Sequence, residues 1–93
     1  MPYELRYHSD VRDVDIPQLN HTLRNRIRKA VEQRLTISPH QYGEPLRKTL
    51  KGYWKLHVGD YRVVLKIERN EILILVIINR KDIYKKIFER PKF

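Results

Sequence analysis

The 93-residue chain contains no cysteine. This absence excludes disulfide bonds, thiol catalysis and cysteine-ligated zinc, and it fits a reducing cytoplasm. None of the four histidines (His8, His21, His40 and His57) has a second histidine or a carboxylate at a recognisable metal-ligand spacing. We therefore predict no metal site and no small-molecule cofactor.

Long apolar stretches are absent as well. The longest apolar run, residues 72–78, is far shorter than the roughly 20 residues that a membrane-spanning helix needs. The first residues also lack the pattern of a signal peptide. We expect a cytoplasmic protein without a membrane partner, and the length leaves room for one domain, residues 1–93.

Acidic residues are scarce after residue 15. The chain has 20 lysines and arginines against 11 aspartates and glutamates, a formal net charge of +9. Residues 1–15 hold four of the acids, so the remainder carries 18 basic and seven acidic residues. Such an excess suits a polyanion, which is nucleic acid or an acidic protein in preference to an anionic membrane.

Hydrophobic periodicity predicts a small α+β domain. Apolar residues at spacings of three and four predict a long helix that begins near Pro17 and ends before Ser38, after a short helical turn. Asn79 is placed to cap a short C-terminal helix. Alternation predicts four strands, at residues 3–7, about 51–58, 61–68 and 71–78, with a loop over 36–49. The expected architecture is an antiparallel sheet of about four strands, with two N-terminal helices on one face and the short C-terminal helix.

The stretch "KLHVGDYR", residues 55–62, predicts a tight hairpin around Gly59-Asp60. A two-residue loop sets His57 opposite Arg62, and directly opposed residues share one face of a sheet. Lys55, His57 and Arg62 then form one cationic surface, which we call the hairpin face, with Tyr53 alongside. Trp54 and its alternate neighbours point into the core. The hairpin face either docks an anion or is simply a solvated surface.

A second group of functional candidates follows the last strand. Arg80 and Tyr84 are four residues apart, so on a continuous helix they share a face. Arg80 also lies close to the end of the hairpin sheet. Tyr84 is either part of a site or an amphipathic packing residue.

Taken together, the second half of the chain resembles the RelE branch of the RelE/ParE toxin superfamily of prokaryotic toxin–antitoxin systems. The motifs that carry the resemblance are Pro45-Leu46, Leu50-Lys51-Gly52, Tyr53-Trp54, the hairpin from Val58 to Arg62, the apolar strand of residues 72–78, and the run from Arg80 to Tyr84. The likeness extends over nearly the whole chain. It implies a RelE/ParE-like fold of the microbial-RNase type.

The resemblance also implies a function and partners. It implies a ribosome-dependent endoribonuclease that cuts messenger RNA in the decoding site, and an acidic antitoxin protein that folds over the basic surface and silences it. The family's catalytic positions map onto Lys55, Arg62, Arg80 and Tyr84, with His57 at a position where some members have a second lysine. Many members have Gly-His where this chain has Ile78-Asn79, so the identity of the general base stays open.

RNA cleavage without a metal needs a base for the 2′-hydroxyl and cations for the phosphorane. Arg62 and Arg80 stay protonated and can only bind phosphate and stabilise charge. His57, with an ordinary pKa of about 6.5, can act as base or acid. Lys55 and Tyr84 would need lowered pKa values to transfer protons, and Tyr84 alternatively stacks on a base.

Other basic residues are expected to hold ribosomal RNA, although a solvated helix face explains several of them equally well. These candidates are Arg24, Arg28, Lys29, Lys48, Lys51, Lys66, Lys81, Lys85 and Lys86. Three alternative functions remain: a ParE-like toxin that inhibits DNA gyrase, an RNA-binding module without catalysis, and a decayed toxin. The gyrase inhibitor would not need the cationic residues of the hairpin face.

Overall fold

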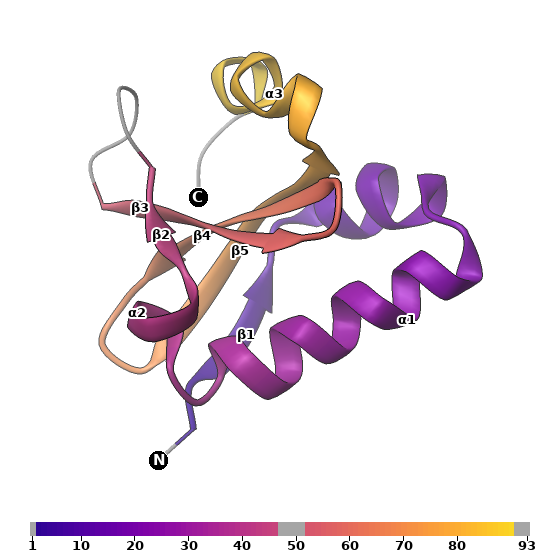
Figure 1. The fold of residues 1–93 in the computed structure, drawn as a ribbon. Coiled ribbons are helices and arrows are strands. Elements are labelled where there is room, and N and C mark those ends of the chain that lie inside the picture. Colours follow the sequence, from indigo (N-terminus) through magenta and orange to yellow (C-terminus); the bar gives the residue numbers. More distant parts are fainter. Residues whose placement is uncertain (1, 47–51, 91–93) are drawn as a thin grey trace.

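A five-stranded sheet forms the centre of the protein, with helices on both of its faces (Figure 1). The computed structural model describes residues 2–46 and 52–90. The strand order is β1-β5-β4-β3-β2. The strands are β1 (Glu4–Tyr7), β2 (Glu44–Pro45), β3 (Tyr53–Val58), β4 (Tyr61–Ile67) and β5 (Glu71–Asn79). The predicted α+β class is therefore confirmed.

The sheet differs from the prediction in two respects. First, β1 pairs with β5 in parallel, whereas all other neighbours are antiparallel. Second, the expected loop over residues 36–49 contains α2 (Pro39–Tyr42) and the fifth strand, β2. The sequence pattern did not predict this strand because proline is rare inside strands. An edge strand tolerates proline, because the outer side of its backbone needs no hydrogen-bond partner.

The N-terminal helices cover one face of the sheet. Two short turns, η1 (Val11–Asp15) and η2 (Ile16–Gln18), precede α1 (His21–Ala30), which continues directly into η3 (Val31–Leu35). The long helix begins at His21 and not near Pro17, because Leu19 is extended and Asn20 provides the cap. The Asn20 Oδ1 accepts a 2.8 Å hydrogen bond from the Leu23 amide. Pro17 lies in the separate turn η2.

This helix layer encloses the larger hydrophobic core. Ile27, Val31 and Leu35 from the helix pack with Leu56 and Leu65 of the hairpin. Trp54 points to the same side, as the predicted register requires, but it is only partly buried. Its ring meets His40 of α2 edge-on, with 5.2 Å between the ring centroids. The predicted orientation of Trp54 is correct, and its full burial is not.

A smaller core lies on the opposite face, beneath α3 (Ile83–Glu89). The turn η4 (Arg80–Asp82) leads into α3, and Asn79 caps it as predicted, accepting a 3.0 Å bond from the Lys81 amide. Ile83 and Ile87 pack there on the sheet. A bulge in the β4–β5 pairing turns the consecutive residues Leu75 and Val76 to this side.

A buried ion pair between Arg90 and Asp15 connects the end of α3 to the N-terminal turns. The Arg90 guanidinium donates to both carboxylate oxygens of Asp15, at 2.7 and 2.9 Å, and to the Leu75 carbonyl at 3.0 Å. Asp15 also accepts from the Ile77 amide at 2.8 Å. Both residues are buried, with 5% relative exposure each. The pair therefore joins three elements that are far apart in sequence.

Candidate functional site

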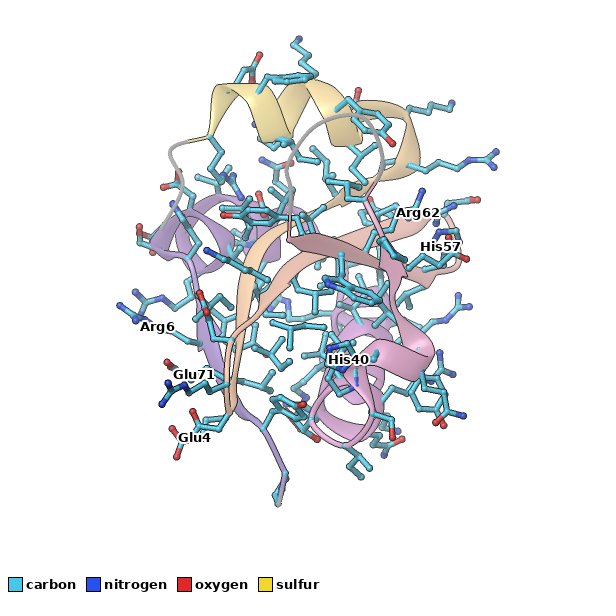
Figure 2. All side chains as sticks on the ribbon, turned by 90° about the vertical axis from the view of Figure 1, so that its left-hand side faces the viewer. Glu4, Arg6, His40, His57, Arg62 and Glu71 are labelled. Carbon is cyan, nitrogen blue, oxygen red and sulfur yellow. The ribbon has the colours of Figure 1, made fainter. Side chains whose placement is uncertain are left out.

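The β3–β4 hairpin has the register that the sequence predicts. His57 stands opposite Arg62, and Lys55 opposite Val64. Gly59 has φ +60°, the left-handed conformation that a tight hairpin turn of this kind demands. Lys55, His57 and Arg62 consequently share one face, and Figure 2 shows His57 and Arg62 side by side at the hairpin end of the sheet.

The hairpin face is not cationic along its whole length. Tyr53, which the sequence places beside these cations, is 8% exposed and belongs to the smaller core with Val64. Tyr53 is buried because α3 covers this part of the sheet, where Ile83 and Ile87 pack. Lys55, His57 and Arg62 therefore lie toward the turn end of the hairpin, whereas Lys66 lies at the other end, opposite Tyr53.

Arg62 is held against the hairpin turn. Its Nη1 donates to the Gly59 carbonyl at 3.0 Å and to the Tyr61 carbonyl at 2.9 Å. These two bonds use two of the five N–H donors of a guanidinium. They fix the position of the cation while donors on the other nitrogens stay available for an anion.

His57 faces a carboxylate on the neighbouring strand. Its Nε2 lies 3.6 Å from Oε2 of Glu44, and both side chains are substantially exposed. The pKa of His57 is lowered from 6.5, first by desolvation and then by the Arg62 and Lys55 charges, with Glu44 acting in the opposite direction. The imidazole is therefore predominantly neutral at pH 7 and free to accept a proton.

Glu44 is the residue that sequence reasoning missed. It lay within the predicted loop, and only the pairing of β2 with β3 brings it opposite Lys55 and next to His57. A carboxylate beside an imidazole stabilises the ring once it is protonated. A two-residue edge strand that contains proline leaves too short a pattern to predict this contact.

Arg80 reaches the same end of the hairpin from the last strand. Its amide donates to the Asp60 carbonyl at 2.8 Å, and its Nε lies 3.9 Å from the Asp60 carboxylate. The Arg80 side chain is 61% exposed, so this ion pair is weak and readily exchanged for another anion. The turn η4 thus places a second guanidinium beside the hairpin.

Tyr84 belongs to a different element from Arg80. Arg80 begins η4, whereas Tyr84 lies on α3 and is 38% exposed. The expectation of one continuous helix that carries both residues is not met, because the first three residues form a tighter turn. Within residues 2–46 and 52–90, no hydrogen bond or ion pair links Tyr84 to Lys55, His57, Arg62 or Arg80.

The peripheral cations occupy varied environments. Arg24 donates to the carbonyls of Ile16 and Leu19, at 3.3 and 3.1 Å, so it has a structural role at the start of α1. Lys66 pairs with Glu68 at 3.4 Å. Five other candidates are exposed or partly exposed: Arg28, Lys29, Lys81, Lys85 and Lys86. Lys48 and Lys51 lie outside the described residues.

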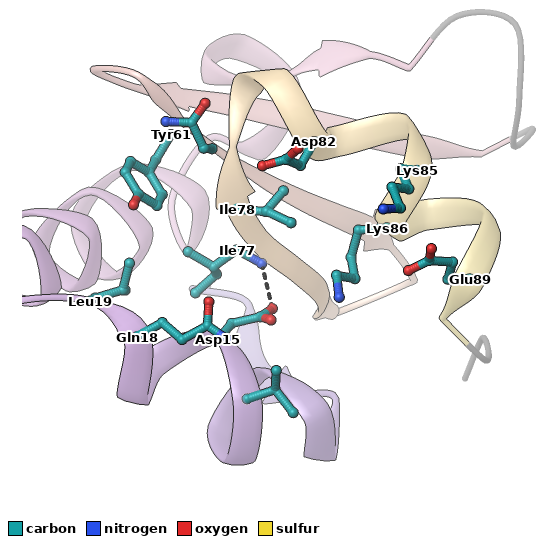
Figure 3. Close-up of a pocket in the computed structure, with 12 residues that line it drawn as sticks. Asp15, Gln18, Leu19, Tyr61, Ile77, Ile78, Asp82, Lys85, Lys86 and Glu89 are labelled. Carbon is teal, nitrogen blue, oxygen red and sulfur yellow. Dashed lines mark hydrogen bonds between the residues drawn. The ribbon is translucent and has the colours of Figure 1, made fainter.

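A pocket near the start of α3 has a mixed charge. It has a volume of about 340 Å³ and lies between η1–η2, the end of β5 and α3 (Figure 3). Lys85 and Lys86 line it together with Asp82 and Glu89. Because acids balance the lysines, this pocket is a poorer anion site than the hairpin end.

Two other features are absent from the described residues, a metal-ligand cluster and a membrane-spanning helix. No group of three or more histidine, aspartate and glutamate side chains there is arranged to hold a metal ion. No helix in the described ranges is both long enough and apolar enough to cross a membrane.

Comparison with known proteins identifies a matching family and similar folds. Residues 4–84 match the family described as "ParE toxin of type II toxin-antitoxin system, parDE". Toxin RelG of Mycobacterium tuberculosis is 34% identical over 92 residues, which covers 92% of this chain and 100% of that protein.

Solved structures show the same architecture. A chain of the toxin–antitoxin complex RelBE2 from Mycobacterium tuberculosis gives a TM-score of 0.78 at 26% identity, covering 88% of this chain and 95% of that one. A chain of the archaeal RelE–RelB complex from Pyrococcus horikoshii gives 0.69 at 22% identity, over 86% and 97% of the two chains. The latter similarity concerns the fold alone.

Proposed function

The chain belongs to the RelE/ParE family of toxins from type II toxin–antitoxin systems, and on this premise we propose that it is a metal-independent endoribonuclease that cuts messenger RNA in the decoding site of the ribosome. The observation that carries the proposal is the pairing of a neutral imidazole, His57, with a fixed guanidinium, Arg62, across one hairpin. Transesterification of RNA needs a base for the 2′-hydroxyl and a cation for the phosphate, and this pair supplies both on one sheet face.

In the proposed reaction, the substrate supplies its own nucleophile. The 2′-hydroxyl oxygen attacks the adjacent phosphorus while His57 accepts its proton, and Glu44 stabilises the resulting imidazolium. The bond from phosphorus to the 5′-oxygen breaks, and water protonates that oxygen. The products are a 2′,3′-cyclic phosphate and a 5′-hydroxyl.

The remaining residues of the site bind the substrate. Arg62 and Arg80 hold the phosphoryl oxygens and stabilise the charge of the phosphorane. Lys55 adds a third cation on the same face, and the exposed Tyr84 ring stacks on a neighbouring base. With so few catalytic groups, the enzyme depends on the ribosome to orient the RNA.

The test is cleavage in a purified system. The protein is mixed with ribosomes that carry a defined messenger RNA, and the ends of the fragments are analysed. We expect 2′,3′-cyclic phosphate ends within the codon in the decoding site, and much slower cleavage of the same RNA without ribosomes. Intact RNA on programmed ribosomes would refute the proposal.

The pH dependence of cleavage reports on His57. Because the pKa of its imidazole is lowered, the single-turnover rate should rise with pH, inflect below 6.5 and reach a plateau at neutral pH. His57→Ala should lower the rate and remove the inflection. Glu44→Gln should shift the inflection further down, since the carboxylate raises this pKa. A wild-type inflection retained in His57→Ala would assign the base elsewhere.

We also propose an acidic antitoxin as the protein partner. The net charge of +9 and the exposed cations at the hairpin favour binding of an acidic protein segment. The similar RelBE2 and RelE–RelB structures are complexes of a toxin with its antitoxin. Co-expression with the neighbouring gene product should yield a stable complex at low salt. A basic or neutral neighbour that does not co-purify would count against this partner.

A gyrase-directed activity is the second candidate, because the matching family is described by its ParE toxins. Such an inhibitor acts through protein–protein contact, and it has no use for a neutral imidazole beside a fixed guanidinium. Arg62→Ala separates the two activities, since it should abolish RNA cleavage and leave a gyrase contact largely intact.

A further inference from the structure

A second cationic site lies behind the hairpin, in a groove of about 240 Å³ between the long helix and the β3–β4 turn. Three cations line it from the helix side, Arg26, Lys29 and Arg34. Arg26 and Lys29 are three residues apart and share one face of α1, and Arg34 of η3 lines the same groove. His57 and Gly59 line the groove from the hairpin side. We call this feature the helix–hairpin groove.

The charge of the groove is not balanced. Its lining contains no aspartate or glutamate, and among the described residues none of the three cations takes part in an ion pair. Arg34 only rests on the Tyr42 ring, with 5.9 Å between the guanidinium carbon and the ring centroid. Like charges in such proximity repel each other, so an anion bound between them would be stabilised.

The groove continues into the candidate active site across one glycine. A Cβ atom on Gly59 would lie 3.0 Å from Nη1 of Arg26, and the Gly59 carbonyl accepts the 3.0 Å bond from Arg62. The hairpin turn is thus flanked by Arg26 on the groove side and by Arg62 on the hairpin face. His57 lines the groove and also stands opposite Arg62, so the groove and the hairpin face adjoin at the hairpin turn.

We propose that the helix–hairpin groove binds phosphates of the RNA strand next to the scissile bond. This inference rests on the proposed ribonuclease function and adds a substrate-binding subsite to it. Positively charged grooves that follow the backbone are the usual means of holding single-stranded nucleic acid. A strand whose scissile phosphate lies at Arg62 passes over the Gly59 turn and meets Arg26 first, then Lys29 and Arg34.

An acidic segment of a protein partner is the competing ligand for the same charges. Adjacency to the hairpin face favours RNA, because a strand bound at Arg62 can pass over the Gly59 turn directly to Arg26. Binding of an acidic peptide in the groove would not require that the groove lie next to the His57–Arg62 pair.

The test uses Arg26→Gln and Arg34→Gln, which remove charge and nearly preserve length. Single-turnover cleavage is measured on programmed ribosomes over a range of salt concentrations. Each variant should raise the half-saturating concentration about fivefold and flatten the salt dependence by roughly one phosphate contact. Arg69→Gln is the matched control, because Arg69 is exposed at the opposite end of the hairpin strands and should leave both values unchanged.

A binding measurement keeps this inference separate from the proposed activity. Fluorescence anisotropy with a short single-stranded RNA should show the same loss of affinity for the two groove variants whether or not the protein cleaves. If both variants bind and process RNA as the wild type does, the subsite is wrong while the ribonuclease proposal stands. If they bind RNA normally and lose affinity only for an acidic antitoxin segment, the groove belongs to the protein partner.

Discussion

Replacing Arg62 by alanine is expected to slow single-turnover cleavage on programmed ribosomes by about 10²–10³-fold, the usual loss when one well-placed donor to a developing anion is removed. The structure explains why this position should matter so much. Two turn carbonyls hold the guanidinium in place before any substrate arrives, so its charge needs no reorganisation during the reaction. Arg80→Ala should produce a loss in the same range, since Arg80 is proposed to hold the same phosphoryl group.

Two further variants make the Arg62 experiment specific. Arg62→Lys keeps the charge but lacks the second nitrogen that can face the phosphate while the first bonds the turn, so it should recover only part of the rate. Arg12→Ala removes an exposed arginine from η1 and should cleave at the wild-type rate. Thermal unfolding of all variants is the control that the fold persists. If Arg62→Ala cleaves at the wild-type rate, Arg62 is not catalytic and the hairpin face serves only as a docking surface.

The largest expected loss of stability comes from Asp15→Asn. This substitution preserves shape but leaves the buried Arg90 charge without its bidentate partner. Removal of one member of a buried, hydrogen-bonded ion pair typically costs about 3–5 kcal/mol of unfolding free energy. The measurement is urea unfolding, read from the change in midpoint at constant slope.

The neighbouring Asp13 provides the control. Asp13→Asn changes the same charge in the same turn at an exposed position, and it should alter stability by less than about 0.5 kcal/mol. Combining Asp15→Asn with Arg90→Gln should destabilise less than the sum of the two single changes, because the residues act as a pair. Additive effects would mean that Arg90 is stabilised mainly by the Leu75 carbonyl and by Asp10, 3.6 Å from its Nε.

The hairpin was predictable from the sequence because two independent signals agree there. Gly59-Asp60 specifies a tight turn, and a slip of one residue would expose Leu56 and Leu65, which the larger core buries. The pairing of His57 with Arg62 follows directly from that register. The Asn79 cap and the buried positions of Ile83 and Ile87 were likewise predictable, since both depend on local spacing.

Contacts between distant segments were not predictable in the same way. Alternation identifies β1 as a strand, but nothing in its own residues selects β5 as a parallel neighbour. Asp15 and Arg90 are 75 positions apart, and only the tertiary arrangement of the sheet and both helix layers brings them together. Glu44 reaches His57 through an edge strand of two residues, which is too short to leave a periodic pattern.

The difference between the predicted and observed hairpin face has a single physical origin. Period-two alternation correctly groups Tyr53 with Lys55 and His57, but it contains no information about which part of a face another element will cover. The helix α3 covers the Tyr53 end and leaves the turn end exposed. Lys55, His57 and Arg62 thereby lie in the region where Arg80 and the helix–hairpin groove also meet the hairpin, and Lys66 lies at the other end, opposite Tyr53.

The most direct test of the central claim is primer extension on messenger RNA from translating cells after brief induction of the wild-type protein or of Arg62→Ala. The account predicts in-frame cuts that are spread along translated regions, present with the wild type, absent with Arg62→Ala and suppressed when translation is blocked. Uncut messenger RNA together with double-strand DNA breaks would contradict it and would identify the protein as a gyrase-directed toxin.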